Sequence, residues 1–192
     1  MNILHLDSSI TGDNSASRAL SAAIVRELTD ADPTATVAYR DLVAQPLDHL
    51  TLPGFGSAAS TEALAEFKAA DIVVIGAPMY NFTIPTQLKA WIDRVLIAGE
   101  TFRYTESGPQ GLAGDKTVIV ALARGGLYGE GTPQRSIEHA ERYLCDALAF
   151  IGITEPQFVI AEGLALGDEA RAEALAAAHA AVRRIGAACP VG

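Results

Sequence analysis

Short apolar runs alternate along the chain with longer stretches in which apolar residues recur every three or four positions. The short runs predict β-strands, because each is bounded by polar or turn-forming residues. Their ranges are 2–7, 36–40, 71–76, 116–123 and 156–161. Several of them are apolar on both faces, which is typical of parallel strands covered by helices on both sides. The alternation therefore predicts an α/β chain with five βα units around one parallel sheet.

The periodic stretches predict the helices between these strands. Each of four stripes places its apolar residues on one helical face: Leu20, Ile24 and Leu28; Leu88, Trp91, Ile92 and Val95; Ile137, Leu144, Leu148 and Ile151; Leu175, Ala178, Val182 and Ile185. A glycine-containing segment at 52–60 predicts a loop that leads into a short helix ending near Ala70. Five parallel strands with alternating helices fit the doubly wound strand order 2-1-3-4-5, whose ligand site lies between the first and third strands.

Composition and charge narrow the classes of partner. The chain has 192 residues, of which 49% are apolar, so we expect one domain spanning 1–192. A net charge of -9 disfavours binding to nucleic acid or to an anionic membrane, and no apolar run approaches the roughly 20 residues of a membrane-spanning helix. Cys145 and Cys189 lie far apart, and the N-terminus lacks a signal-peptide pattern. These features favour a cytoplasmic protein without disulfides, whose partner is a small molecule or another protein.

A hydroxyl-rich loop follows the first strand and runs directly into a helix. It contains Ser9, Ser15, Ala16 and Ser17. Backbone N–H groups at a helix N-terminus, together with serine hydroxyls, can hold a phosphate. The loop lacks the glycine spacing and the lysine of a nucleoside triphosphate site, so a phosphate monoester fits it better. The alternative is that Ser15 or Ser17 only caps the helix, which serine does often.

The loop after the third strand carries large apolar and aromatic side chains. Its residues are Pro78, Met79, Tyr80, Asn81 and Phe82. Large apolar side chains at a strand end need cover, and a flat aromatic cofactor can supply it while neighbouring backbone groups bond to its polar edge. The alternative is a hydrophobic staple or a contact between subunits.

The loop after the fourth strand contains two adjacent glycines. Its residues Ala123, Arg124, Gly125 and Gly126 would let the backbone approach a planar ligand without an intervening Cβ. The backbone N–H groups there could stabilise negative charge on a reduced ring. Paired glycines are weak as an isolated signal, so it is their place at the carboxyl end of a strand that favours this hypothesis.

Taken together, these motifs resemble the FMN-dependent NADH-azoreductase and NAD(P)H quinone reductase family, whose fold is flavodoxin-like. The specific motifs are Pro-Met-Tyr-Asn-Phe at 78–82 and Thr-Phe-Arg-Tyr-Thr-Glu at 101–106, and Arg-Gly-Gly at 124–126 supports them. The resemblance runs nearly end to end and is missing mainly over 46–61, where this chain is shorter. Ala123 stands where the family commonly has a hydroxyl residue.

The resemblance implies an enzyme that takes electrons from NADH or NADPH and reduces quinones and azo compounds by two-electron hydride transfer through FMN, with ping-pong kinetics. It implies a cofactor site formed by Ser9, Ser15, Ala16, Ser17, Pro78, Met79, Tyr80, Asn81, Phe82, Ala123, Arg124, Gly125 and Gly126. It also implies a homodimer in which Tyr104 and Phe150 line the pocket over the flavin. No catalytic nucleophile is required. Tyr128 is a candidate proton donor.

Other classes of protein can share this fold. A flavodoxin-type electron carrier would also bind FMN but would act by docking to protein partners, and it remains the alternative. A phosphoacceptor domain needs an aspartate at the end of the third strand, where Gly76 stands, and a Rossmann dehydrogenase needs a glycine fingerprint after the first. Histidines at 5, 49, 139 and 179 are scattered, so we expect no metal site.

Overall fold

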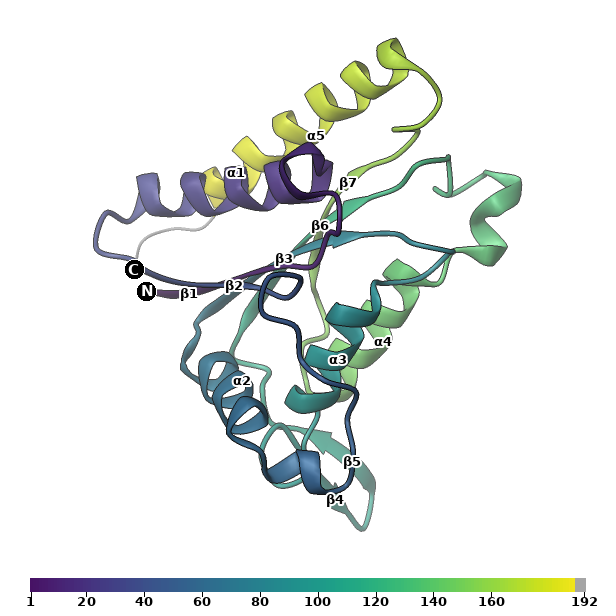
Figure 1. The fold of residues 1–192 in the computed structure, drawn as a ribbon. Helices are drawn as coiled ribbons and strands as arrows, with labels where there is room; N and C mark the ends of the chain where they lie inside the picture. Colours follow the sequence, from purple (N-terminus) through teal and green to yellow (C-terminus); the bar gives the residue numbers. More distant parts are fainter. Residues whose placement is uncertain (189–192) are drawn as a thin grey trace.

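The computed structural model describes residues 1–188, and its centre is a parallel sheet (Figure 1). The strands of this sheet are β1 (Asn2–Asp7), β2 (Thr36–Asp41), β3 (Ile72–Pro78), β6 (Thr117–Ala123) and β7 (Gln157–Ala161). They lie in the order β2-β1-β3-β6-β7, with every neighbouring pair parallel. The predicted order 2-1-3-4-5 is therefore confirmed. Cys189 lies outside the described residues.

Strand β3 ends later than the sequence pattern predicts. The prediction stopped at Gly76, whereas pairing with β6 continues to Pro78, which lies opposite Ala123. Proline is tolerated there because the pairing of β3 with β1 already stops at Gly76, so the missing N–H of Pro78 leaves no carbonyl of β1 without a donor. The loop beyond β3 therefore starts at Met79, and Pro78 belongs to the sheet.

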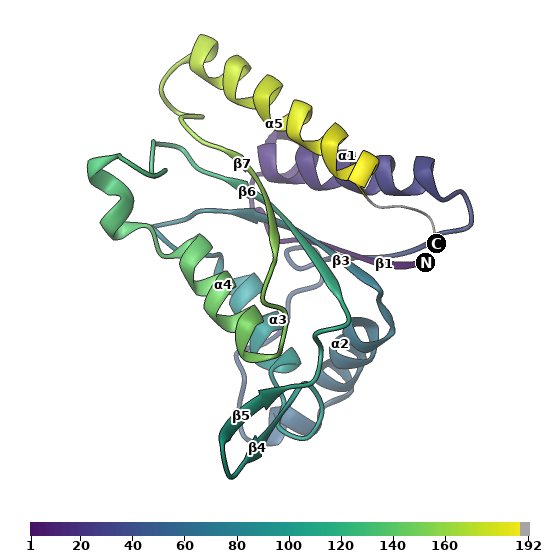
Figure 2. The same ribbon diagram turned by 180° about the vertical axis from the view of Figure 1, so that it is seen from behind.

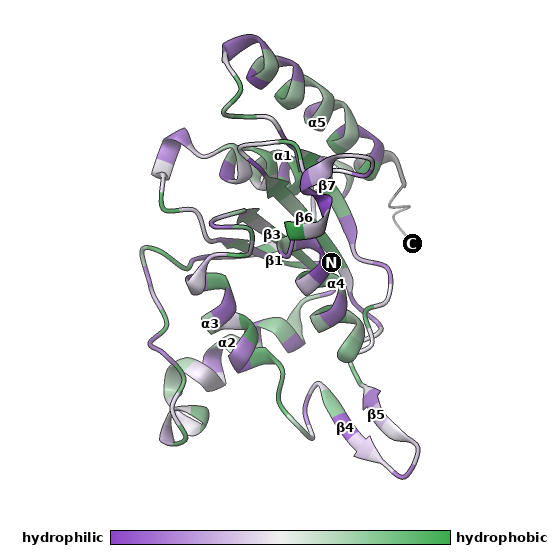
Figure 3. Cartoon of the chain, turned by 90° about the vertical axis from the view of Figure 1, so that its right-hand side faces the viewer, coloured by the Kyte–Doolittle hydropathy of each residue, from purple (hydrophilic) through white to green (hydrophobic). Residues whose placement is uncertain are grey.

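Helices cover both faces of the sheet (Figure 2). On one face lie α1 (Ala16–Ala31) and α5 (Asp168–Ala188), which pack along each other; on the other lie α2 (Ala58–Ala69), α3 (Thr86–Val95) and α4 (Ala140–Phe150). Two clusters of buried apolar side chains result, one on each side of the sheet. Figure 3 shows the strands as mainly hydrophobic and the helices as mixed, which is the pattern of a sheet with both faces covered.

Two helix starts differ from their predictions. Ile137, predicted on the apolar stripe of α4, lies instead in a short 3-10 helix, Pro133–Ile137, and is 41% exposed. The reason is that Glu138 Oε1 accepts hydrogen bonds from the N–H groups of Ala140 and Glu141, so α4 begins only after this carboxylate. Helix α2 begins at Ala58, inside the predicted loop, because the Ser57 hydroxyl caps it by accepting from the Ser60 N–H.

A two-stranded hairpin lies outside the main sheet, and the strand pattern did not predict it. It consists of β4 (Phe102–Thr105) and β5 (Gly108–Gly111) and joins α3 to β6. Helix α3 returns the chain to the amino end of the sheet before β6 starts, so the hairpin lies at the end opposite to the carboxyl ends of the strands (Figure 1). It packs closely on the chain after α4, since a Cβ at Gly111 would collide with the backbone N of Gly152.

Candidate functional site

A cleft of about 300 Å³ opens where the carboxyl ends of β1, β3 and β6 meet. This is the point at which the chain connections leave the sheet toward opposite faces, the usual ligand site of a doubly wound fold. Of the residues predicted to hold a cofactor, the cleft is lined by Ser9, Ser15, Ala16, Ser17, Pro78, Met79, Tyr80, Ala123, Arg124 and Gly125. Asn81 lines an adjoining cleft of about 580 Å³ that shares Met79 and Tyr80, and neither cleft is lined by Phe82 or Gly126.

The first turn of α1 presents hydroxyl and amide groups to the cleft. The Ser15 Oγ caps the helix by accepting from the Arg18 N–H at 3.2 Å, and it lies 3.1 Å from the Ser17 Oγ. The N–H groups of Ala16 and Ser17 belong to the first turn, where an α-helix provides no carbonyl acceptor. Ser15 is thus a helix cap, as the simpler hypothesis held, and it also lines the cleft. The geometry is that of an anion site at a helix N-terminus.

Arg18 fixes the shape of this loop, a role that sequence reasoning missed. Its Nη2 donates to the Ser9 carbonyl at 2.8 Å, and its guanidinium makes two hydrogen bonds of 2.8 Å with the Asp41 carboxylate. This pairing raises the pKa of Arg18 and lowers the pKa of Asp41. The positive charge of Arg18 is therefore neutralised by Asp41, at the end of β2, and does not face the cleft.

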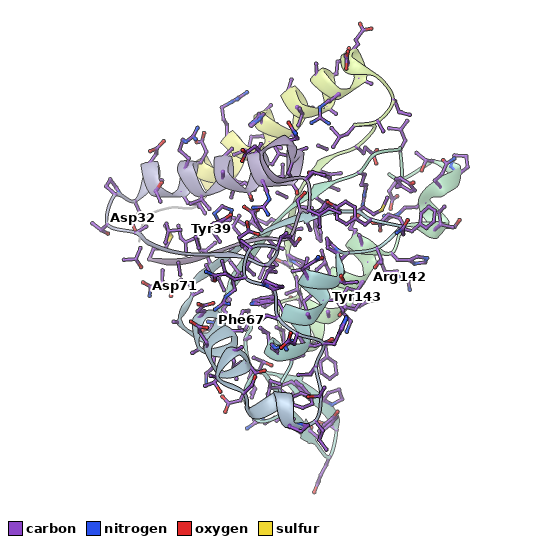
Figure 4. All side chains as sticks on the ribbon, viewed as in Figure 1. Asp32, Tyr39, Phe67, Asp71, Arg142 and Tyr143 are labelled. Atoms are coloured by element: carbon purple, nitrogen blue, oxygen red, sulfur yellow. The ribbon has the colours of Figure 1, made fainter. Side chains whose placement is uncertain are left out.

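A buried polar network joins the end of β1 to α1 and β2 next to the serine loop. Asp7 accepts hydrogen bonds from the Ser21 hydroxyl at 2.8 Å and the Tyr39 hydroxyl at 3.1 Å, and His5 Nε2 lies 2.9 Å from the Ser21 Oγ. Burial, and after it the charge of Asp7, raises the pKa of Tyr39 to about 12. Figure 4 shows Tyr39 beside α1. The carboxylate at the end of β1 is thus held by structural hydrogen bonds.

The loop beyond β3 is a strained two-residue turn. The Tyr80 N–H donates to the Thr83 carbonyl at 2.9 Å and the Thr83 N–H to the Tyr80 carbonyl at 3.1 Å. Asn81 and Phe82 between them have φ values of 46° and 73°, the only positive φ values at non-glycine residues within 1–188. This is the geometry of a type I′ turn, which normally favours glycine. The Tyr80 hydroxyl also accepts from the Ile10 N–H at 3.1 Å, so it joins the loops beyond β1 and β3.

The strain at Phe82 predicts that glycine is more stable than alanine at this position. We expect Phe82→Gly to have a free energy of unfolding about 1 kcal/mol higher than Phe82→Ala, because only glycine adopts a φ of 73° without a steric penalty. Both variants lose the same exposed ring, so the comparison isolates the backbone. Urea unfolding of the two variants measures it. If Phe82→Ala is as stable as Phe82→Gly, the turn is not strained.

Arg124 lies at the centre of a buried ion cluster behind the loop beyond β6. It is 1% exposed and lies within 3.4 Å of carboxylate oxygens of Glu138, Glu141 and Glu162. Glu162 in turn accepts from the Tyr128 N–H at 2.9 Å. The cluster joins the ends of β6 and β7 to the start of α4. Because both terminal nitrogens of its guanidinium face carboxylates, what this segment offers a ligand is mainly its backbone.

The backbone after Arg124 is open to a ligand. Within residues 1–188, no backbone carbonyl accepts from the N–H of Gly125 or Gly126. A Cβ at Gly125 would meet only Ala165, at 3.5 Å. Gly125 is also exposed along the cleft. The segment therefore fits the prediction of a backbone surface that a planar ligand can approach.

This fold and site place the chain among known proteins. A model of a protein family with the flavodoxin-like fold matches residues 1–185. The chain belongs to the flavodoxin-like family. The predicted fold class is confirmed by this match and by the strand order of the sheet.

Several relatives of this flavodoxin-like chain are enzymes. The chain is 54% identical to an FMN-dependent NADH:quinone oxidoreductase of Xanthomonas campestris, over 95% of this chain and 98% of that protein. It is 55% identical to a protein of the same name from Methylorubrum populi, over 93% and 95%. Among solved structures, an azoreductase from Bacillus anthracis str. Sterne has a TM-score of 0.88 at 30% identity, covering 97% of this chain and 98% of that one. An FMN-dependent NADH-azoreductase from Bacillus anthracis str. Ames Ancestor, solved with FMN, has a TM-score of 0.85 at 26% identity, with coverage of 97% and 98%.

Two residues predicted to cover the ligand lie elsewhere on this flavodoxin-like chain. Tyr104 and Phe150 both contact Phe102, with ring centroids 5.5 and 4.7 Å apart, and they form a cluster at the hairpin. Neither lines the cleft. Tyr128 lies beside the turn beyond β3, since its ring is edge-on to that of Phe82 with centroids 6.3 Å apart, but it lines neither cleft. One chain alone therefore leaves the cleft without Tyr104 and Phe150.

Two further findings concern metals and membranes. In the part of the chain that the structure describes, no group of three or more His, Cys, Asp and Glu side chains could hold a metal ion. No helix within the same residues has the length and apolar character needed to cross a bilayer.

Proposed function

We propose that this chain is an FMN-dependent NADH:quinone oxidoreductase that also reduces azo compounds. The observation that carries the proposal is the cleft at the carboxyl ends of β1, β3 and β6, with a hydroxyl and amide surface at α1 and open glycine backbone after β6. Relatives that are 54–55% identical over nearly the whole chain are named as such oxidoreductases. The prediction of an FMN-dependent enzyme is thereby confirmed.

The residues of the cleft fit FMN. Its lining includes no carboxylate, so nothing there repels a phosphate dianion. The phosphate would be held by the hydroxyls of Ser9, Ser15 and Ser17 and by the N–H groups of the first turn of α1. The opposite side of the cleft offers apolar surface from Pro78, Met79, Ala123, Leu164 and Ala165 to a flavin ring.

When bound, FMN supplies the two-electron chemistry, and the protein supplies orientation and donors. We assign the backbone N–H groups of Gly125 and Gly126, together with those of Asn81 and Phe82 in the strained turn, to the polar edge of the ring. Tyr128 is the candidate proton donor in this proposal, because its ring lies edge-on to Phe82 of the turn. NADH and the acceptor use the same place in turn, which gives ping-pong kinetics.

The complete site belongs to a homodimer in this proposal. Large apolar residues are exposed around the loops of the cleft: Phe82 is 45%, Leu127 47% and Ile137 41% exposed. A second copy would cover them and bring its own Tyr104 and Phe150 over the flavin. Residues 1–192 would act as one FMN-binding domain per subunit, in the cytoplasm, where NADH is supplied.

The alternatives differ from this proposal at specific points. A flavodoxin-type electron carrier shares the fold, but the relatives named above are oxidoreductases acting on small molecules. A phosphoacceptor domain is disfavoured because β3 ends at Pro78, with no aspartate at that end, and Asp7 is occupied by Ser21 and Tyr39.

The decisive experiment is anaerobic spectroscopy of the purified protein. We expect a yellow protein, or one that becomes yellow with added FMN, whose visible absorbance is bleached by NADH and restored by benzoquinone. An electron carrier would bind FMN but would be monomeric and oxidise NADH very slowly. A colourless protein that takes up no FMN would contradict the proposal.

A further inference from the structure

The cleft is lined by two arginines, Arg124 and Arg171, which differ in whether carboxylates neutralise their charge. Arg124 is surrounded by three carboxylates, so its charge is neutralised within the protein. Arg171, in the first turns of α5, lines the same cleft, is half-buried and forms no ion pair with any described carboxylate. Asp168 and Glu169 precede it on the same helix, yet neither comes within ion-pair distance of it. Arg171 is therefore the cleft's uncompensated cation within the described chain.

The serine loop has hydrogen-bond donors but no free positive charge of its own. Its nearest cation, Arg18, is bound to Asp41 and lies 3.8 Å from an Asp7 oxygen. A phosphate monoester carries a charge of about -2 at pH 7. Hydroxyl and amide donors offset this charge only through their dipoles, so a cation at the open side of the loop would add a favourable interaction.

The position of Arg171 is fixed by the backbone of the cleft. The chain leading into α5 is bound to the loop beyond β6, because the Leu164 N–H donates to the Arg124 carbonyl at 3.2 Å and the Ala165 N–H to the Gly125 carbonyl at 2.9 Å. The Arg171 N–H donates to the Gly167 carbonyl at 3.0 Å. The start of α5 is therefore held beside the loop beyond β6, and Arg171 lines the cleft together with Ser15 and Ser17.

We propose that Arg171 is the cationic ligand of the FMN phosphate, placed across the cleft from the hydroxyls of Ser15 and Ser17. This inference rests on the proposed function, since it assigns a residue to the phosphate end of the same cofactor. It makes Arg171 a determinant of selectivity for FMN over riboflavin, which has the same ring and chain but no phosphate.

The test compares the affinities of flavin-free protein for FMN and for riboflavin, measured by quenching of flavin fluorescence. Arg171→Gln is expected to weaken FMN binding about 10- to 100-fold, the effect of losing a charge-assisted hydrogen bond. Riboflavin binding should change less than about twofold. The variant should also show a weaker dependence of FMN affinity on salt, because one charge interaction has been removed. Arg171→Lys should recover part of the lost FMN affinity.

The matched control is Arg183→Gln. Arg183 is exposed on the same helix, 12 residues further along, so this variant makes the same change of charge at a distance of about 18 Å. We expect it to leave both affinities unchanged.

Several outcomes would overturn the assignment. Equal weakening of FMN and riboflavin would mean that Arg171 supports the fold or the ring, and an unchanged FMN affinity would mean that it does not reach the phosphate. A raised KM for NADH with unchanged FMN affinity would assign it to the dinucleotide instead. Failure of the proposed function is distinguishable in the wild-type protein, which would then either bind neither flavin or bind FMN without being reduced by NADH.

Discussion

Arg124→Met is expected to lower the free energy of unfolding at pH 7 by about 3–5 kcal/mol, the cost of removing one partner from a buried ion cluster. Arg124 is 1% exposed, so water screens its three carboxylate contacts little. Methionine retains much of the apolar stem but leaves Glu138, with a fully buried side chain, beside Glu141 and Glu162 without the central cation. Urea unfolding measures the loss.

The loss should depend on pH in a defined direction. Burial raises the pKa of Glu141, but its hydrogen bond to Arg124 and the charges of Arg124 and Arg135 outweigh this, so the pKa of Glu141 is lowered overall. A lowered folded-state pKa contributes stability above the pKa of the unfolded chain, and this stability is lost as pH falls. The variant lacks the part of that contribution that comes from Arg124 and keeps the part that comes from Arg135. The difference between wild type and Arg124→Met should therefore be largest at pH 7 and shrink toward pH 4.

Arg135→Met provides the matched control. Arg135 contacts the same Glu138 and Glu141, but its side chain is 36% exposed. Because a solvated ion pair contributes little to stability, we expect Arg135→Met to lower the free energy of unfolding by at most about 1 kcal/mol. If both variants lose the same free energy of unfolding, the burial of Arg124 does not determine how much the cluster contributes to stability.

The fold was predictable from sequence because its signals are local. Runs such as 71–76 and 116–123 are apolar on both faces, and alternation with helical periods leaves few arrangements of five parallel strands. The hairpin of β4 and β5 escaped prediction because each strand has only four residues and one of the two is Gly-Pro-Gln-Gly. Ile137 was assigned to α4 because its spacing is helical, while the carboxylate cap that delays the helix start is visible only in three dimensions.

The site was predictable in part for a topological reason. The carboxyl ends of β1, β3 and β6 must meet at one edge, so the loops after them share a cleft wherever the strand order holds. No comparable topological rule predicts which charged side chains, far apart in the sequence, form ion pairs. Arg18 pairs with Asp41 and Arg124 with Glu162, and nothing in the local pattern distinguishes these partners from other charged residues. For the same reason, the free state of Arg171 becomes visible only once the ion pairs of the fold are known.

Gly76 shows how tightly the first turn of α1 packs on the sheet. It lies within β3, opposite Asp7. A Cβ at this position would collide with the Asp7 Oδ1 and would lie 3.3 Å from the Ser17 carbonyl oxygen. The first turn of α1, which carries the hydroxyl and amide groups of the cleft, therefore packs directly against Gly76, which has no side chain.

Gly76→Ala is accordingly expected to lower both stability and FMN affinity. Overpacking of this kind costs about 1–3 kcal/mol, because Asp7 or α1 must move to admit the methyl group. Movement of α1 would carry Ser17 away from the phosphate, so affinity for FMN should fall more than affinity for riboflavin. Urea unfolding and flavin titration measure the two effects. Gly56→Ala, where an added Cβ meets nothing within 4 Å, should change stability by no more than about 0.5 kcal/mol. If Gly76→Ala matches that control in both measurements, the helix does not depend on the glycine for its position, and the phosphate site is not built on this contact.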